Sequence, residues 1–233
     1  MISFSDIYQR AINLIDDPDI SRAYANNPIE FKRIMYNFLV NGVSIITAPT
    51  AVCDALALQT APIGKGEEII GTGVKEYTLT IEIPEGADIM VYTVDAKGRM
   101  IVDYDAEVKD GKVTFSQELP NDSKALVEYY SDGSFDADFS NITKKNNVPA
   151  ASLEQRVIDM LARATVISWA DKEKNFLLDI RNLLNDTDFK LHSPANSTKS
   201  KVEWVADLRN EIFNLQNKLD WDMRNRARSR YGY

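Results

Sequence analysis

The chain has 233 residues, which is enough for one good hydrophobic core and a second small one, since domains commonly contain about 100 to 200 residues. One cysteine and one histidine exclude an internal disulfide and a Cys/His zinc site, so packing has to stabilise the fold. The formal net charge of -8 argues against a broad nucleic-acid-binding surface.

The sequence has no pattern of a membrane span or of a secretory signal. Its longest uncharged, fairly apolar stretch, 38–53, is interrupted by polar residues and Pro49, whereas a bilayer-spanning helix needs about 20 largely apolar residues. Asp6 lies where a secretory signal would have its basic and apolar regions. We therefore expect a protein that is made in a cytoplasm and does not cross a membrane.

Two amphipathic helices are predicted near the start of the chain. Apolar residues spaced by three and four predict a helix over 4–15, ended by the Asp-Asp-Pro sequence at 16–18. Asn27 as N-cap and Pro28 at the first helical position begin a second helix, so the pair resembles a helical hairpin. The small and β-branched residues of 43–63 favour an extended or partly buried crossing segment, without a definite element.

The central part of the chain has the two-residue period of β-strands. Apolar residues alternate with polar ones from Tyr77 to Ile83, which predicts a half-buried strand. Further strands are predicted at 89–95, 99–104, 106–109, 112–117 and 125–130. Asp110-Gly111 fits a two-residue hairpin turn. Together these predict a small antiparallel sandwich or barrel. The glycines before it lack the Lys-Ser/Thr pair of a phosphate-binding loop and are interpreted as a flexible loop between domains. These glycines are Gly64, Gly66, Gly71 and Gly73.

Helical periodicity returns after a polar linker at 141–149. A helix capped by Ser152 and a shorter helix after Asp171 are predicted, followed by a polar loop at 186–198. Ser200 begins the final helix, whose apolar stripe alternates spacings of three and four, as in a bundle seam. The stripe consists of Val205, Leu208, Ile212, Leu215 and Leu219.

This order of elements predicts an α+β fold in which a helical bundle, made by N-terminal and C-terminal helices, contains an inserted β domain. We expect the bundle to comprise 1–63 and 141–220, and the β-sandwich or barrel to comprise 64–140. Residues 221–233 then form a separate basic, aromatic C-terminal tail.

The sequence offers no catalytic or metal-binding pattern, so we expect neither an enzyme nor a cofactor. His192 lies in a polar loop without triad spacing, and Cys53 has no basic neighbour to activate it. The acids at 16–19 fit a helix-terminating turn. A possible calcium loop fails because the position twelve from Asp136 is Asn147 instead of glutamate. That loop would use Asp132, Asp136, Asp138 and Ser140.

The C-terminal tail is the strongest candidate for a functional site. Residues 218–233 contain five basic and two acidic residues, a net charge of +3, which leaves -11 for the rest of the chain. Arginine, tryptophan and tyrosine are enriched at interface hot spots, so we expect partner binding here. A solvated terminus and nucleic-acid contact remain as alternatives. The predicted partner-binding residues are Trp221, Arg224, Arg226, Arg228, Arg230, Tyr231 and Tyr233.

The opening segments Phe4 to Tyr8 and Asp16 to Ile20, the helical pattern and the arginine-rich end at Tyr231-Gly232-Tyr233 resemble the head-to-tail adaptor, or ring, proteins of short-tailed bacteriophages such as the crAss-like phages. The resemblance implies a virion protein of the neck and tail. It implies a cyclic, usually twelvefold ring that binds the portal through its C-terminal extension, contacts downstream tail or ring proteins and surrounds a channel for DNA without reading its sequence. The β insertion departs from the plainest all-helical adaptors.

Two other functional classes remain open. The β insertion suits a protein-binding or carbohydrate-binding module of another virion or tail protein, which an isolated 66–130 fragment would test. An enzyme would need an active site assembled from scattered carboxylates with at least one strongly perturbed acid.

Overall fold

The computed structural model describes residues 1–15, 18–57, 59–95, 97–137, 139–140, 142–143, 149–185 and 194–230, and the side chains among them outside 18–19, 173–201 and 226–230. The chain divides into two compact units. The helical unit comprises Met1–Ser21, Arg33–Thr60 and Ser134–Tyr233, and the β unit comprises Arg22–Lys32 and Ala61–Gly133.

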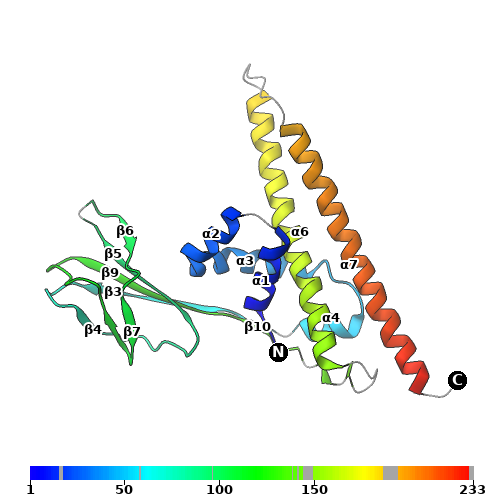
Figure 1. Ribbon diagram of the computed structural model, residues 1–233, viewed down its shortest axis with the longest axis horizontal. Coiled ribbons are helices and arrows are strands. Elements are labelled where there is room, and N and C mark those ends of the chain that lie inside the picture. Colours follow the sequence, from blue (N-terminus) through cyan, green and yellow to red (C-terminus); the bar gives the residue numbers. More distant parts are fainter. Residues whose placement is uncertain are drawn as a thin grey trace. The chain divides into compact units, whose positions relative to one another are not determined.

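The α+β class is confirmed, with helices towards both ends of the chain and antiparallel sheets between them (Figure 1). The described helices are α1 (Phe4–Ile15), α2 (Pro18–Asn26), α3 (Pro28–Val43), α4 (Thr50–Leu56), α6 (Ala150–Asn185) and α7 (Pro194–Arg230). The described strands are β1 (Ile2–Ser3), β2 (Gln59–Thr60), β3 (Ile63–Ile70), β4 (Glu76–Thr78), β5 (Asp88–Val94), β6 (Met100–Val102), β7 (Glu107–Lys109), β8 (Lys112–Thr114), β9 (Lys124–Ser131) and β10 (Ser134–Phe135).

Helix α1 has the predicted bounds and buries the predicted stripe, including Phe4 and Ile7, against α6. The start of α3 is also as predicted, because Asn27 Oδ1 accepts a hydrogen bond of 3.0 Å from the backbone N–H of Glu30. This side-chain cap satisfies one of the N–H groups that a helix leaves free at its first turn.

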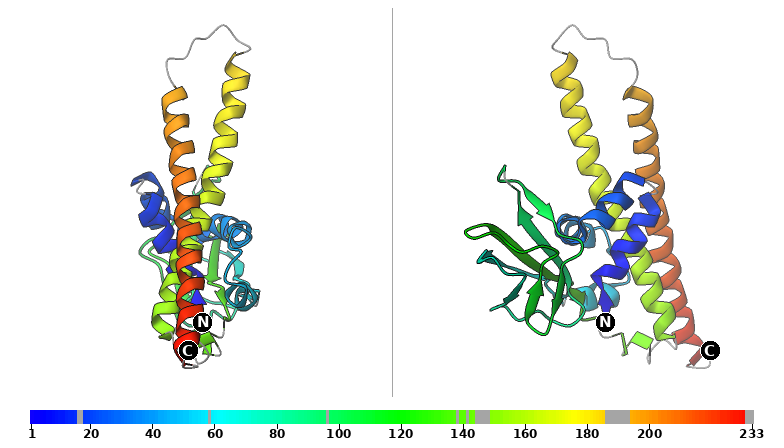
Figure 2. Two further views of the ribbon diagram at one scale, coloured as in Figure 1. Left: turned by 90° about the vertical axis from the view of Figure 1, so that its right-hand side faces the viewer. Right: turned by 60° about the vertical axis from the view of Figure 1, so that its left-hand side comes forward.

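The long hairpin of α6 and α7 forms the main body of the helical unit (Figures 1 and 2). The prediction of two helices around Asp171 is wrong, because α6 has neither proline nor glycine and continues from Ala150 to Asn185. Helix α7 begins at Pro194, before the predicted cap at Ser200. The predicted seam is confirmed for Val205, Leu208, Ile212 and Leu219, which are buried, while Leu215 is partly buried.

Helix α3 approaches α6 closely through a glycine. A Cβ atom added at Gly42 would lie 2.7 Å from the carbonyl carbon of Ala164 and 2.8 Å from its oxygen. No larger residue fits at this position without moving the α6 backbone, so Gly42 fixes the packing of the two helices.

The segment 43–63, for which no definite element was predicted, contains the helix α4. Pro49, in an extended conformation, precedes that helix, and Val52 and Leu56 are buried on one of its faces. A three-stranded sheet of order β1-β10-β2 pairs Thr60 with Ser134, the residues directly before and after the long segment of the β unit.

The β unit contains two antiparallel sheets, one of order β3-β9-β5-β6 and one of order β4-β8-β7. The described strands form a sandwich and no closed barrel, since both sheets contribute side chains to one core. Its buried residues are Ile69, Leu79, Val91, Val113, Phe115, Leu119, Ala125 and Val127. The residues 22–32, assigned from the sequence to the bundle, belong to this unit.

The interpretation of Gly64 and Gly66 as a flexible loop is wrong, because both lie in β3, which pairs with β9 over its whole length. The predicted strand over 77–83 is shortened, and β4 ends at Thr78. Beyond it the N–H groups of Thr80 and Ile81 donate to the Glu67 carboxylate at 2.8 and 3.1 Å, so a side chain replaces the neighbouring strand.

The predicted hairpin turn between β7 and β8 is confirmed. Asp110 and Gly111 have positive φ angles of 51° and 72°, which is the type I′ geometry that favours aspartate followed by glycine. Local turn chemistry therefore sets the register of this pair of strands.

Candidate interaction surfaces

The C-terminal residues 221–230 are not a separate tail, because α7 continues without a break to Arg230. Trp221 is 65% exposed, and Arg224 forms an ion pair of 2.8 Å with Asp220 one turn earlier. Arg226, Arg228 and Arg230 lie on the described helix, although their side chains are outside the described residues, as are Tyr231 and Tyr233. The structure therefore brings Trp221 and Arg224 together on a rigid element.

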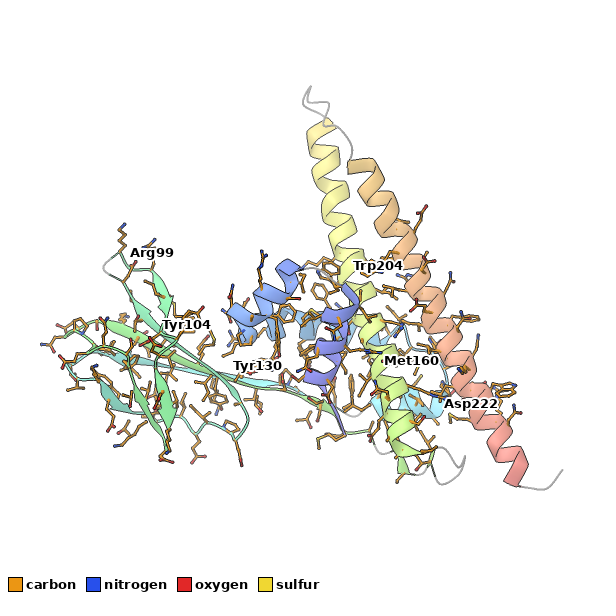
Figure 3. The ribbon with its side chains drawn as sticks, in the orientation of Figure 1. Arg99, Tyr104, Tyr130, Met160, Trp204 and Asp222 are labelled. Atoms are coloured by element: carbon orange, nitrogen blue, oxygen red, sulfur yellow. The ribbon has the colours of Figure 1, made fainter. Side chains whose placement is uncertain are left out.

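The buried side of α7 faces α6 and lies opposite Trp221. At 100° per residue, Trp221 is half a turn from Ile212, which is buried. Asp222, labelled in Figure 3, accepts a hydrogen bond of 2.6 Å from Arg156 on α6, and Met223 is buried. The residues that follow Trp221 thus anchor the helix and leave the indole facing outwards.

Sequence reasoning missed a second exposed aromatic residue on α7. Phe213 is 63% exposed. It precedes Trp221 by eight residues, which is about two helical turns. Its position outside the apolar stripe is the signal that could have identified it, because an aromatic residue on the polar side of an amphipathic helix is uncommon.

Ion pairs at both ends of the contact hold α7 against α6. Arg163 lies 2.7 Å from Glu211, and Asp171 lies 2.5 Å from Arg209, with Arg156 and Asp222 nearer the C-terminus. The residue numbers of the partners increase along α6 and decrease along α7, as they must in an antiparallel hairpin. Each exposed pair contributes little, but together they fix the register of the outward residues.

A buried glutamine attaches the loop before α4 to α7. The Gln216 side-chain oxygen accepts hydrogen bonds from the backbone N–H groups of Thr47 and Ala48, at 3.1 and 2.8 Å, and from the Thr47 hydroxyl at 3.2 Å. The residue is only 5% exposed. This contact gives two backbone N–H groups of the loop a single acceptor on α7.

A buried charge cluster fixes the helical segment 22–32 on the sheet of the β unit. The Lys32 ammonium lies 2.5 Å from Asp88 and 2.7 Å from Asp132, and its side chain is only 5% exposed. Burial alone would lower the pKa of Lys32, but the hydrogen bonds and charges of Asp132 and Asp88 outweigh it and raise the pKa. The geometry of this cluster indicates that it stabilises the fold.

The residues considered for metal binding have other roles or lie outside the described part. Asp132 pairs with Lys32, and Asp136 accepts hydrogen bonds from Thr60 and Ser134, which lower its pKa. Asp16, Asp17, Asp138 and Asn147 lie outside the described residues. Among the described residues no three histidine, cysteine or acidic side chains are placed to hold a metal ion.

The single thiol, Cys53, has no activating partner among the described residues. Burial and the charge of Asp54 raise the pKa of Cys53, and its sulfur lies 3.4 Å from the carbonyl oxygen of Ile46. A raised pKa disfavours the reactive thiolate. His192 lies outside the described residues.

Charge is distributed unequally between the two units. The β unit has nine basic and sixteen acidic residues, a net charge of -7, while the helical unit has eighteen basic and nineteen acidic residues, a net charge of -1. The predicted acidic body is therefore mostly the β unit. No described helix combines the length and apolar character that a membrane span needs.

No protein-family model, curated protein or solved structure matches the chain.

Proposed function

We propose that this chain is a structural virion component, a head-to-tail adaptor of a short-tailed bacteriophage. In this role copies of the chain form an oligomeric ring, bind the portal through the C-terminal end of α7 and connect it to the tail. The observation that carries the proposal is the exposed Trp221, which stands beside Arg224 on a helix held in place by buried and ion-paired neighbours.

The physical support comes from preorganisation. A partner that binds Trp221 does not have to order the backbone around it, because Asp222 and Met223 already fix this part of α7 on α6. Binding a preordered aromatic residue avoids much of the entropic cost of association. The basic residues that continue to Arg230 supply planar cations for carboxylates of a partner.

The charge distribution is consistent with a channel for DNA. An acidic surface repels phosphates and therefore does not trap a duplex that has to slide past it. The net charge of -7 on the β unit makes this unit the acidic part of the ring. The twelvefold symmetry is what the resemblance to adaptor proteins implies.

Electron microscopy of the purified chain mixed with its portal protein tests the proposal. The expected result is a ring of chain copies on one face of the portal, with the end of α7 at the contact. A species that stays monomeric and does not bind the portal would contradict the proposal.

A further inference from the structure

The short strand β6 forms a free edge of the larger sheet in the β unit. The N–H of Asp103 donates to Val91 and the N–H of Asp95 donates to Arg99, both at 2.9 Å. Hydrogen bonding alternates along an antiparallel pair, so the backbone groups of Arg99, Ile101 and Asp103 face β5. Those of Met100 and Val102 therefore point towards the free edge, where no described residue pairs with them.

Two hollows adjoin this edge, and Val102 and Asp103 border both of them. The smaller, of about 190 Å³, is lined mostly by apolar side chains that include Ile89 and Tyr104. The larger, of about 350 Å³, is bounded by Ile101 and by the segment from Ser116 to Pro120. A chain lying along β6 would have space for side chains next to the strand.

The edge strand is only three residues long, which limits pairing, but it exposes apolar side chains. Met100 and Ile101 are exposed, and so is Tyr104 directly after the strand, which Figure 3 labels. Edge strands are commonly protected by lysine, proline or a covering segment, because an apolar edge pairs readily with other chains. Exposed apolar side chains at an open edge therefore indicate an interaction surface.

The acidic side chains around the edge favour a partner with positive charge. Asp103 borders both hollows, Glu118 lines the larger one and Asp105 follows Tyr104. None of the three forms an ion pair with a described residue, and the Asp103 carboxylate accepts one hydrogen bond, of 3.0 Å, from the backbone N–H of Ser116. Lys124 also lines the larger hollow, but it lies 2.6 Å from Glu68. The unit as a whole carries -7. A basic partner gains from these charges, whereas an acidic one is repelled.

We infer that the edge of β6 is a docking site for an extended, basic segment of a partner protein. The segment adds a strand beside Met100 and Val102. Its lysine or arginine side chains enter the hollows, where they meet Asp103 and Glu118, and the apolar side chains between them lie on the opposite face of the strand. The inference goes beyond the adaptor function and does not depend on it, since the site and Trp221 lie in different units.

Methyl NMR of the full-length chain, labelled at methionine and isoleucine, tests the inference. The probe is a nine-residue peptide that alternates valine and lysine, and the comparison peptide alternates valine and glutamate. We expect saturable shifts of the Met100, Ile101 and Ile89 methyl signals with the lysine peptide only. Shifts that are absent, or equal for both peptides, would overturn the inference.

Two matched variants locate the site. Ile101 and Ile70 are both 48% exposed, but Ile70 lies at the end of β3, the opposite edge of the same sheet. Ile101→Lys is expected to weaken binding of the lysine peptide at least tenfold, and Ile70→Lys to leave it within twofold. Equal weakening by both would show a general charge effect and contradict a site at β6. Shifts of the same signals on concentrating the chain alone would assign the edge to a second copy and would also overturn the inference.

Discussion

The helical unit and the β unit expose apolar side chains in different electrostatic settings. In the helical unit, which is nearly neutral, the exposed Phe213 and Trp221 stand on a helix whose other side is anchored by ion pairs. In the β unit, with a net charge of -7, the exposed Met100 and Ile101 lie on an open sheet edge near acids that form no ion pair with a described residue. The outward side of α7 and the edge of β6 therefore suit partners of different chemistry.

The largest expected effect tests whether the two units have independent cores. Phe115→Ala removes a buried ring that packs at 5.8 Å between centroids against Tyr77, and we expect it to destabilise the β unit by about 3 to 5 kcal/mol. Denaturant titration followed by NMR signals of each unit measures the effect. Signals of the helical unit should keep their midpoint.

The reciprocal substitution is the control for that experiment. Met160→Ala opens a cavity in the helical unit, where the residue is fully buried, and should cost about 2 to 5 kcal/mol there. If either substitution shifts both sets of signals equally, the chain unfolds as one cooperative body and the comparison of two units fails.

Lys32→Met should destabilise the β unit by about 2 kcal/mol, less than a fully buried ion pair would, because Asp88 is about a third exposed. The pKa of Lys32 is raised above its ordinary value of 10.5. The stabilisation that the charged Lys32 gives to the folded β unit is therefore fully present below pH 10.5 and is lost as the pH rises through the raised pKa. The stability difference between wild type and variant, measured at several pH values, should be constant near neutrality and shrink in alkali. A difference that vanished at neutral pH would contradict the role of Lys32.

Gln216→Ala should cost about 1 to 2 kcal/mol in the helical unit, because the N–H groups of Thr47 and Ala48 lose their acceptor. Thermal unfolding measures the change. Gln216→Glu, which keeps an acceptor oxygen, is the matched control and should lose less. Equal losses would contradict the role of the side-chain oxygen as the acceptor for Thr47 and Ala48.

The smallest expected effect concerns Phe213. Because this side chain is exposed, Phe213→Ala should change the free energy of unfolding by no more than about 0.5 kcal/mol. Chemical denaturation of the variant provides the check. A larger loss would place Phe213 in the core of the helical unit and remove it from the exposed surface.

The sequence predicted what local chemistry determines. The Asn27 cap, the Asp110-Gly111 turn and the seam of α7 each depend on residues close together in the chain, and the structure contains all three. The break predicted at Asp171 is absent, because an aspartate also fits a helix interior when it gains an ion pair, here with Arg209.

Features that depend on tertiary contacts were missed. Strand β3 contains Gly64 and Gly66, which have poor strand propensity, yet its pairing with β9 stabilises the extended backbone. The exposure of Phe213 and the open edge of β6 likewise follow from which neighbours the fold supplies. For the candidate site, composition indicated Trp221 and Arg224, but a free tail was expected where the structure has a continuous helix.

The most direct test of the adaptor proposal is the affinity of the full-length chain for its portal protein, compared between Trp221→Ala and Phe213→Ala. The two aromatic residues are almost equally exposed and lie on the same helix, so they are matched apart from their distance to the C-terminal end. We expect Trp221→Ala to weaken binding by about 2 kcal/mol, roughly thirtyfold, as for an interface hot spot, and Phe213→Ala to change it by less than about threefold. Unchanged binding of the Trp221→Ala variant would contradict the account.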